Sequence, residues 1–143
     1  MFSKSIIWAT IVAFLFFYFI PPLFYSAADT CLSKHVINHI ARDSYDFGIL
    51  GIGVLLFSYT FVHIFQKWSN GIYSNKNGFA FGIWATLFTT ASMSFIRYAT
   101  TDFAEAEYYA LDSVYWLAMH TIGGVLIAFV CRKTYSYKSS YKK

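Results

Sequence analysis

Charged residues are scarce in this chain. They make up 13% of its 143 residues, whereas about 25% is typical of soluble domains, so much of the surface must face something other than water. The two cysteines, Cys31 and Cys131, are too few for a disulfide framework. The chain also lacks a glycine-rich phosphate loop, a paired-cysteine motif and a nucleophile elbow. These absences argue against a water-soluble disulfide scaffold and leave no catalytic residue to assign.

The chain is instead rich in long apolar runs. Hydrophobic residues make up 57% of the chain and aromatic residues 22%. The four longest runs cover residues 6–25, 47–65, 78–96 and 114–130. A helix of about 20 residues crosses the ~30 Å hydrocarbon core of a bilayer, and backbone groups in lipid must pair within their own segment. The sequence therefore predicts an all-α bundle of four transmembrane helices in one domain, residues 1–133, followed by a basic tail, residues 134–143.

The basic residues divide unevenly between the two sides of this predicted bundle. The side with both termini holds eight of the eleven: Lys4, Lys67, Lys76, Arg132, Lys133, Lys138, Lys142 and Lys143. All seven acidic residues lie on the other side. By the positive-inside rule, both termini are cytoplasmic and the two longer loops lie outside. The two cysteines then lie on opposite faces of the membrane and cannot pair.

The first outer loop is expected to hold a helix of its own. The Pro21-Pro22 pair cannot continue a helical hydrogen-bond ladder, so the first helix should kink or end near Ile20. Apolar residues then repeat every fourth position within residues 29–42. We predict an amphipathic interfacial helix there, with Asp29 or Thr30 as its N-cap.

Small residues mark the expected contacts between helices, because membrane helices approach closely where side chains are small. The set comprises Gly48, Gly51 and Gly53 in the second span, Gly82, Ala85, Thr89 and Ser92 in the third, and Gly123 and Gly124 in the fourth. The residues of the third span are three or four apart and share one helix face. We expect that face at the centre of the bundle.

The two halves of the chain share an internal repeat. Ile7-Trp8-Ala9-Thr10 recurs as Ile83-Trp84-Ala85-Thr86, and each apolar span that follows ends in a tyrosine, three small residues and an aspartate. Gly53-Val54-Leu55-Leu56 has its counterpart in Gly124-Val125-Leu126-Ile127. These matches occur in the same order, so we predict two duplicated hairpins related by an axis along the membrane normal.

The motif at the end of the third span supports a resemblance. The span ends in Arg97-Tyr-Ala-Thr-Thr-Asp102, and a final span with Gly123-Gly124 follows. In this motif and in its hydropathy, the chain resembles a group of small uncharacterised four-helix bacterial inner-membrane proteins. The resemblance implies a multi-pass fold in the bacterial inner membrane. It brings no catalytic residues with it.

Arg97 is the first candidate for a polar site. An arginine at the centre of a membrane helix costs roughly 2.5–3.5 kcal/mol, although near a helix end its long side chain reaches water. Two interpretations stay open: a topological anchor, or a buried ion pair with Asp102 or Asp112. His120, within the fourth span, completes the candidate polar site.

The histidines suggest two cofactor hypotheses. A stripe with a period of four residues comprises Cys31, His35, His39 and Asp43. Helical side chains at this spacing can share a metal ion, although an interfacial helix also places histidines beside its apolar face. His63 and His120 suggest bis-histidine haem ligation, but at 1.5 Å of rise per residue their depths differ by roughly 14 Å, so one iron cannot reach both. We therefore predict no cofactor, with a metal or haem protein as an alternative.

The sequence favours a non-enzymatic role in the membrane. The chain is small, its helices are rich in aromatic residues, and no catalytic set is present. We expect an accessory or structural subunit that contacts the lipid bilayer and other membrane subunits or a second copy of itself. The alternative is a small transporter or channel with a path lined by Thr89, Ser92, Arg97 and His120. The basic tail is too short to indicate nucleic-acid binding.

The charge distribution predicts a testable orientation. In a Cys131→Ser background, Cys31 should react with a membrane-impermeant maleimide in intact cells, and an epitope tag after Lys143 should be recognised only after permeabilisation. Reaction of Cys31 only in permeabilised cells would contradict the positive-inside assignment.

Overall fold

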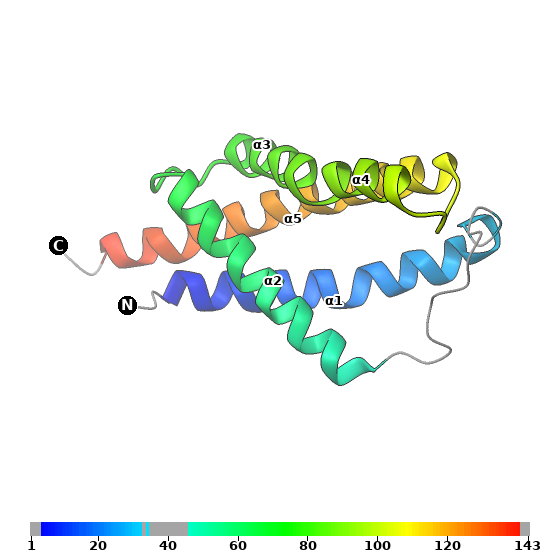
Figure 1. The fold of residues 1–143 in the computed structure, drawn as a ribbon. Coiled ribbons are helices and arrows are strands. Elements are labelled where there is room, and N and C mark those ends of the chain that lie inside the picture. Colours follow the sequence, from blue (N-terminus) through cyan, green and yellow to red (C-terminus); the bar gives the residue numbers. More distant parts are fainter. Residues whose placement is uncertain (1–3, 33, 35–45, 141–143) are drawn as a thin grey trace.

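Four helices run the length of the molecule in this computed structural model, which describes residues 4–32, 34 and 46–140 (Figure 1). The order is α1 (Lys4–Leu32), α2 (Phe47–Trp68), α3 (Asn75–Thr86), η2 (Leu87–Ala91), α4 (Ser92–Thr100) and α5 (Ala106–Ser140). The α3, η2 and α4 segments form one continuous helix. All four helices are long and apolar enough to cross a membrane, which confirms the predicted all-α four-helix bundle. The chain is therefore a multi-pass membrane protein.

The two termini lie at the same end of the bundle, which we call the termini end (Figure 1). The connection between α2 and α3 also lies there. The opposite end, called the far end, holds the last turns of α1, the start of α2 and the connection between α4 and α5. Four helices cross the bundle in turn, and an even number of crossings returns the chain to the end at which it began.

Helix α1 runs through its proline pair without ending. It continues from Lys4 to Leu32, with Pro21 and Pro22 inside it, so the predicted end near Ile20 is wrong. Asp29 and Thr30 belong to this helix, so neither is the N-cap of a new one. Membrane helices tolerate internal proline because neighbouring groups take over the freed backbone positions. The rest of the predicted interfacial helix, residues 33 and 35–42, lies outside the described residues.

The third membrane helix contains a π-helical turn that the sequence did not predict. Within η2 the amide of Ser92 bonds the carbonyl of Leu87, five residues back. Such a turn adds about one residue and rotates the following turns by about 100°. Gly82 is buried and Ala85 and Thr89 are half-buried, as expected, but Ser92 is exposed and Ser94 is buried in its place. The prediction for Ser92 is therefore wrong, because the face changes register at η2.

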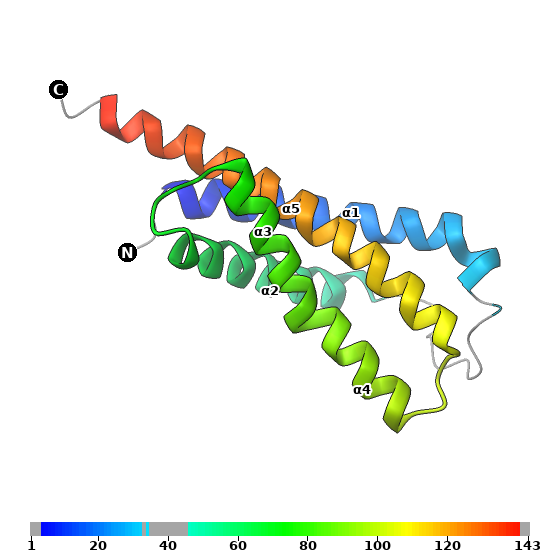
Figure 2. The ribbon, with the colours of Figure 1, turned by 90° about the horizontal axis from the view of Figure 1, so that it is seen from above.

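Glycines let α3 and α5 approach until their backbones touch. A Cβ atom on Gly82 would overlap the carbonyl oxygen of His120, and one on Gly124 would overlap the carbonyl oxygen of Gly78. Gly123 faces α1 instead, where an added Cβ would lie 2.6 Å from Cζ of Phe17. Gly78, Gly82 and Gly124 form this glycine seam between α3 and α5, and Gly123 packs against α1. Figure 2 shows α3 packed along the middle of α5.

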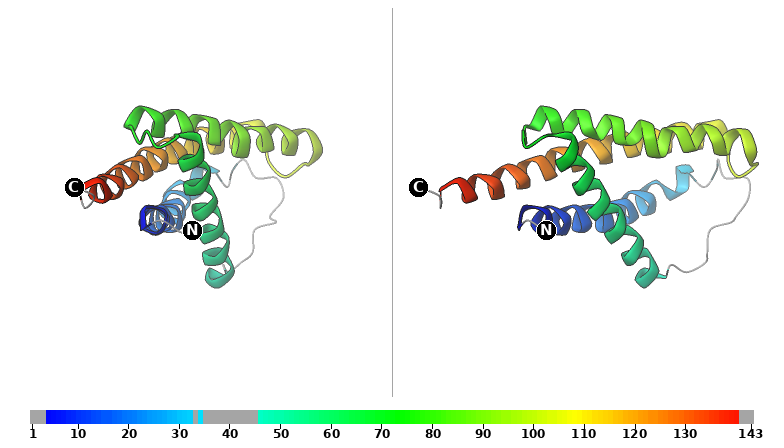
Figure 3. Two further views of the ribbon diagram at one scale, coloured as in Figure 1. Left: turned by 90° about the vertical axis from the view of Figure 1, so that its left-hand side faces the viewer. Right: turned by 60° about the vertical axis from the view of Figure 1, so that its left-hand side comes forward.

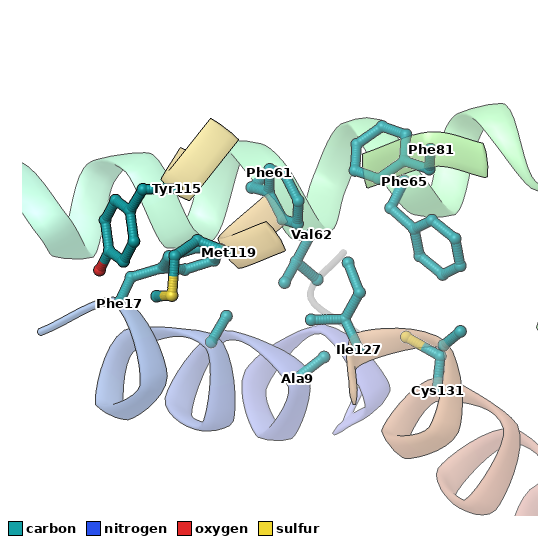
Figure 4. Close-up of a cluster of buried hydrophobic side chains, with 12 residues drawn as sticks. Ala9, Phe17, Phe61, Val62, Phe65, Phe81, Tyr115, Met119, Ile127 and Cys131 are labelled. Atoms are coloured by element: carbon teal, nitrogen blue, oxygen red, sulfur yellow. The ribbon is translucent and has the colours of Figure 1, made fainter. Parts of the chain in front are cut away.

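The termini half of the bundle is closed by a dry aromatic and aliphatic core (Figure 4). Phe81 lies 4.8 Å from Phe61 and 5.3 Å from Phe65 between ring centroids. Ile127 and Cys131 of α5 are 0% exposed. Side chains from all four helices meet in this cluster, so no continuous passage crosses this half of the described structure.

Helix α2 leaves the bundle toward the far end (Figure 3). Gly48 and Gly53 are exposed there, and a Cβ on Gly53 would meet nothing within 4 Å. A Cβ on Gly51 would meet only Tyr18, at 3.7 Å. Within the described chain no neighbouring helix packs against Gly48 or Gly53, because α2 diverges from the bundle there, so their packing role stays a prediction.

The residues matched by the internal repeat do not share one environment. Trp8 and Trp84 are both exposed, at 56% and 64%. Tyr25, however, is half-buried whereas Tyr98 is 57% exposed. The duplication of the two hairpins stays a prediction.

The glycine seam generates a stability prediction. Gly82→Ala places a methyl group against the α5 backbone and should lower the free energy of unfolding by about 1–3 kcal/mol. Gly53→Ala is the matched control, since it adds the same methyl group in open space and should be neutral or up to about 1 kcal/mol stabilising. Melting temperatures in a mild detergent measure both. Equal effects of the two variants would contradict the seam.

Candidate functional site

A cavity of about 280 Å³ lies at mid-depth between α2, η2 and α5. Its lining comprises Phe17, Leu50, Gly53, Val54, Phe57, Thr89, Thr90, Trp116 and His120. The cavity exists because α2 diverges here and because η2 widens the facing helix. A π-helical turn of this kind is found frequently at functional sites. His120 is near the middle of α5, and an ionisable side chain at that depth is a functional candidate by default.

The hydrogen bonds of His120 determine which ring nitrogen carries the proton. Nδ1 lies 3.0 Å from Oγ1 of Thr86. The Thr86 oxygen also lies 2.9 Å from the carbonyl of Gly82 and 3.4 Å from that of Trp116, and both carbonyls can only accept. We therefore assign the hydroxyl proton of Thr86 to these carbonyls and the proton of His120 to Nδ1, which donates to the Thr86 oxygen. Nε2 is then unprotonated and has a free lone pair. Among the described residues no hydrogen bond to Nε2 is seen, and the ring lines the cavity.

Aromatic rings hold the histidine in place. The ring of Phe61 lies 5.8 Å from it and nearly parallel, the ring of Phe57 lies at 5.7 Å, and that of Trp116 at 5.3 Å. Phe17 lies at 6.0 Å and touches the same phenylalanines. The imidazole is 1% exposed and therefore has one fixed orientation.

A second cleft of about 480 Å³ continues from this cavity toward the far end. It shares Phe17, Leu50, Val54 and Trp116 with the cavity and adds Tyr18, Pro21, Pro22, Tyr25, Ser26 and Phe47. The prolines lack the amide protons that would bond the carbonyls of Phe17 and Tyr18 four residues earlier. This cleft lies between α1 and the diverging half of α2.

A polar cluster joins α1 to α5 at the far end. The hydroxyl of Tyr25 donates to Oδ1 of Asp112, and Nε1 of Trp116 donates to the Tyr25 oxygen at 3.2 Å. The rings of Phe24 and Tyr115 stack beside it at 3.8 Å. Tyr25 thus has two roles. It lines the cleft, and its hydroxyl donates a hydrogen bond to the Asp112 carboxylate.

The structure separates His120 from the other residues of the predicted polar site. His120 lies deep in the bundle and Asp112 is half-buried at the far end, bonded to Tyr25. Arg97 and Asp102 are both exposed, so the structure contains no buried ion pair between these two. Arg97 does act electrostatically on the half-buried carboxylate of Asp112, so the pair with Asp112 stays a prediction. An exposed arginine near a helix end fits the anchor interpretation, since its guanidinium can reach water there.

The described residues hold no group of three histidine, cysteine or acidic side chains that could bind a metal ion. His35, His39 and Asp43 of the predicted stripe lie outside the described residues, as does the side chain of Cys31. His63 stacks on Tyr59 at 5.9 Å and is not part of the cavity lining.

No family model, curated protein or solved structure matches the chain in the three comparisons. The site is therefore interpreted from its geometry.

Sequence reasoning found His120 and Thr89 but missed most of their surroundings. Thr86 appeared only as part of the repeat motif, and Tyr25 only as the end of the first span. One signal was present in the sequence. Asp112 and Trp116 are four residues apart on one helix, so their side chains lie on the same face and can contact one neighbouring helix. The identity of that neighbour depends on how α1 packs.

The polar cluster at the far end generates a prediction. Tyr25→Phe leaves the half-buried Asp112 without its hydroxyl donor and should lower the free energy of unfolding by about 1–3 kcal/mol. Tyr18→Phe is the matched control on the same helix, because its hydroxyl makes only an exposed 3.4 Å bond to the carbonyl of Phe47, and it should change stability by less than about 0.5 kcal/mol. Thermal unfolding in detergent compares the two. A Tyr18→Phe loss as large as that of Tyr25→Phe would contradict the cluster's role.

Proposed function

We propose that this membrane protein is an accessory subunit that packs, within the bilayer, against another integral membrane protein. The proposal rests on the exposure of the first half of α2. Its first ten residues leave the bundle and are exposed on nearly every side, with Phe47, Ile49 and Ile52 at 63–65%. A single helix that stands away from its own bundle has surface for a neighbouring helix on both flanks.

The exposed glycines of α2 support a protein partner. A lipid-facing surface gains nothing from glycine, whereas a helix–helix contact in the membrane is enriched in small residues that let backbones approach. Gly53 has open space where a Cβ would stand. A partner helix at this face would also cover the exposed apolar side chains beside it.

A transmembrane channel finds less support. Thr89 and His120 line one cavity, but Ser92 and Arg97 are exposed elsewhere, so the four residues of that hypothesis form no common path. The aromatic and aliphatic core closes the termini half. The geometry favours a one-sided cleft over a passage.

The same proposal includes the location. We place the protein in the bacterial inner membrane with both termini in the cytoplasm, on the strength of the positive-inside charge distribution and the resemblance carried by the motif from Arg97 to Asp102. The subunit role does not depend on this orientation, because α2 is exposed at bilayer depth in either direction.

Site-specific photocrosslinking in native membranes tests the subunit role. A photoreactive amino acid at position 52 of α2, where Ile52 is 63% exposed, should form a discrete protein adduct. Ile122 of α5, which is 51% exposed, is the matched control position and should form mainly lipid adducts. Mass spectrometry of the adduct then separates a foreign subunit from a second copy of this chain. Lipid adducts alone at position 52 would contradict the proposal.

A further inference from the structure

The cavity beside His120 is lined by a ring nitrogen, Nε2 of His120, to which no hydrogen bond is described. Nε2 of His120 carries a lone pair because Nδ1–H is donated to Thr86. The hydroxyl proton of Thr89 is donated to the carbonyl of Ala85 at 2.7 Å, and its oxygen lies 3.5 Å from the hydroxyl of Thr90, a neighbour in the cavity lining. A ligand that satisfies Nε2 must therefore bring a donor, a hydroxyl or an N–H group.

The lining argues against a charged ligand. No acidic or basic side chain other than the histidine is among the lining residues of the cavity. A charge without a partner at this depth would bear the full cost of leaving water. The ligand that fits is uncharged, with one polar group near His120.

Shape and walls indicate a ring. Phe17, Phe57 and Trp116 surround the cavity with flat faces, against which aromatic rings pack edge-on or offset. An engineered protein cavity of roughly 150 Å³ holds benzene, and the cavity of about 280 Å³ here leaves space for two fused rings. The adjoining cleft of about 480 Å³ accommodates an aliphatic substituent.

The entrance lies on the lipid side. Gly53 and Leu50 are both exposed and both line the cavity. Gly53 has no side chain to close the opening, and nothing lies within 4 Å of where its Cβ would be. A molecule dissolved in the bilayer reaches His120 past α2 without crossing a water-filled space.

We propose that this cavity is a binding site for an uncharged, lipid-soluble ring compound whose hydroxyl group donates a hydrogen bond to Nε2 of His120. The walls supply the apolar contact, the histidine supplies orientation, and Thr86 holds the imidazole in the tautomer that can accept. The cavity opens at Gly53, on the face of α2 where the proposed partner helix would also pack, so binding is measured on the isolated chain, in which that face is uncovered.

Two probes that differ in one hydrogen-bond donor test the site. The purified full chain in lipid nanodiscs is titrated with 2-naphthol and, separately, with 2-methoxynaphthalene, which has the same rings without the donor. Quenching of tryptophan fluorescence measures binding. We expect saturable binding of 2-naphthol about tenfold tighter than of its methyl ether, the factor that corresponds to one net hydrogen bond to a buried acceptor. Absence of saturable binding, or equal affinities, would overturn the proposal.

Matched histidine variants assign the preference to one residue. In His120→Phe the ring stays and the acceptor is removed, so the tenfold ratio should fall to about one. His63→Phe makes the same change at the histidine outside the cavity and should keep the ratio. An unchanged ratio in His120→Phe, or a loss in both variants, rules the assignment out.

Two further measurements keep the test decisive if His120→Phe does not fold. Nitrogen-15 NMR of the histidine-labelled wild type should show Nε2 of His120 unprotonated, with a shift change on addition of 2-naphthol; a protonated Nε2 would overturn the proposal. Gly53→Leu, at an exposed position of α2, should block the entrance and weaken 2-naphthol binding at least fivefold, whereas unchanged binding would show that the probe lies elsewhere.

Discussion

The backbone contact between α3 and α5 is the constraint on which the rest of the structure depends. Gly78, Gly82 and Gly124 bring the two helices together without side chains between them. That approach places the Thr86 hydroxyl within hydrogen-bond distance of His120 and sets the tautomer of the imidazole. In a bilayer the lipid is as apolar as the helix surfaces, so close packing of small residues takes the role that hydrophobic burial has in water.

The bundle is tightly packed near the termini end and open toward the far end, because the helices are held together differently at the two ends. Near the termini end, side chains from all four helices interdigitate in a core that includes Phe65, Phe81 and Ile127. Toward the far end α1 is tied to α5 by the half-buried bond between Tyr25 and Asp112, while the bond from Tyr18 to the carbonyl of Phe47 in α2 is exposed and 3.4 Å long, and α2 diverges. The resulting cleft lies beneath α2, with the π-helical turn as its opposite wall, so one divergence produces both the exposed helix and the cavity.

Features that depend on local chemistry could be predicted from the sequence. It predicted four helices and the packing roles of Gly82, Gly123 and Gly124. It failed where distant segments decide. Ser92 was assigned to the central face because a π-helical turn leaves no period in the sequence. The first helix was expected to kink or end near Ile20 because a proline pair interrupts the hydrogen-bond ladder, and it does not end there because membrane helices tolerate internal proline.

What the sequence determined by itself is the architecture in the membrane. Runs of about 20 apolar residues must form helices where no water can satisfy the backbone, and this requirement acts within each segment. The tertiary structure alone decided which polar groups meet. Thr86 and His120 are 34 residues apart and Tyr25 and Asp112 are 87 apart. Their contacts follow from how the helices cross, and helix crossing depends on the fit of several side-chain surfaces at once, which no single segment encodes.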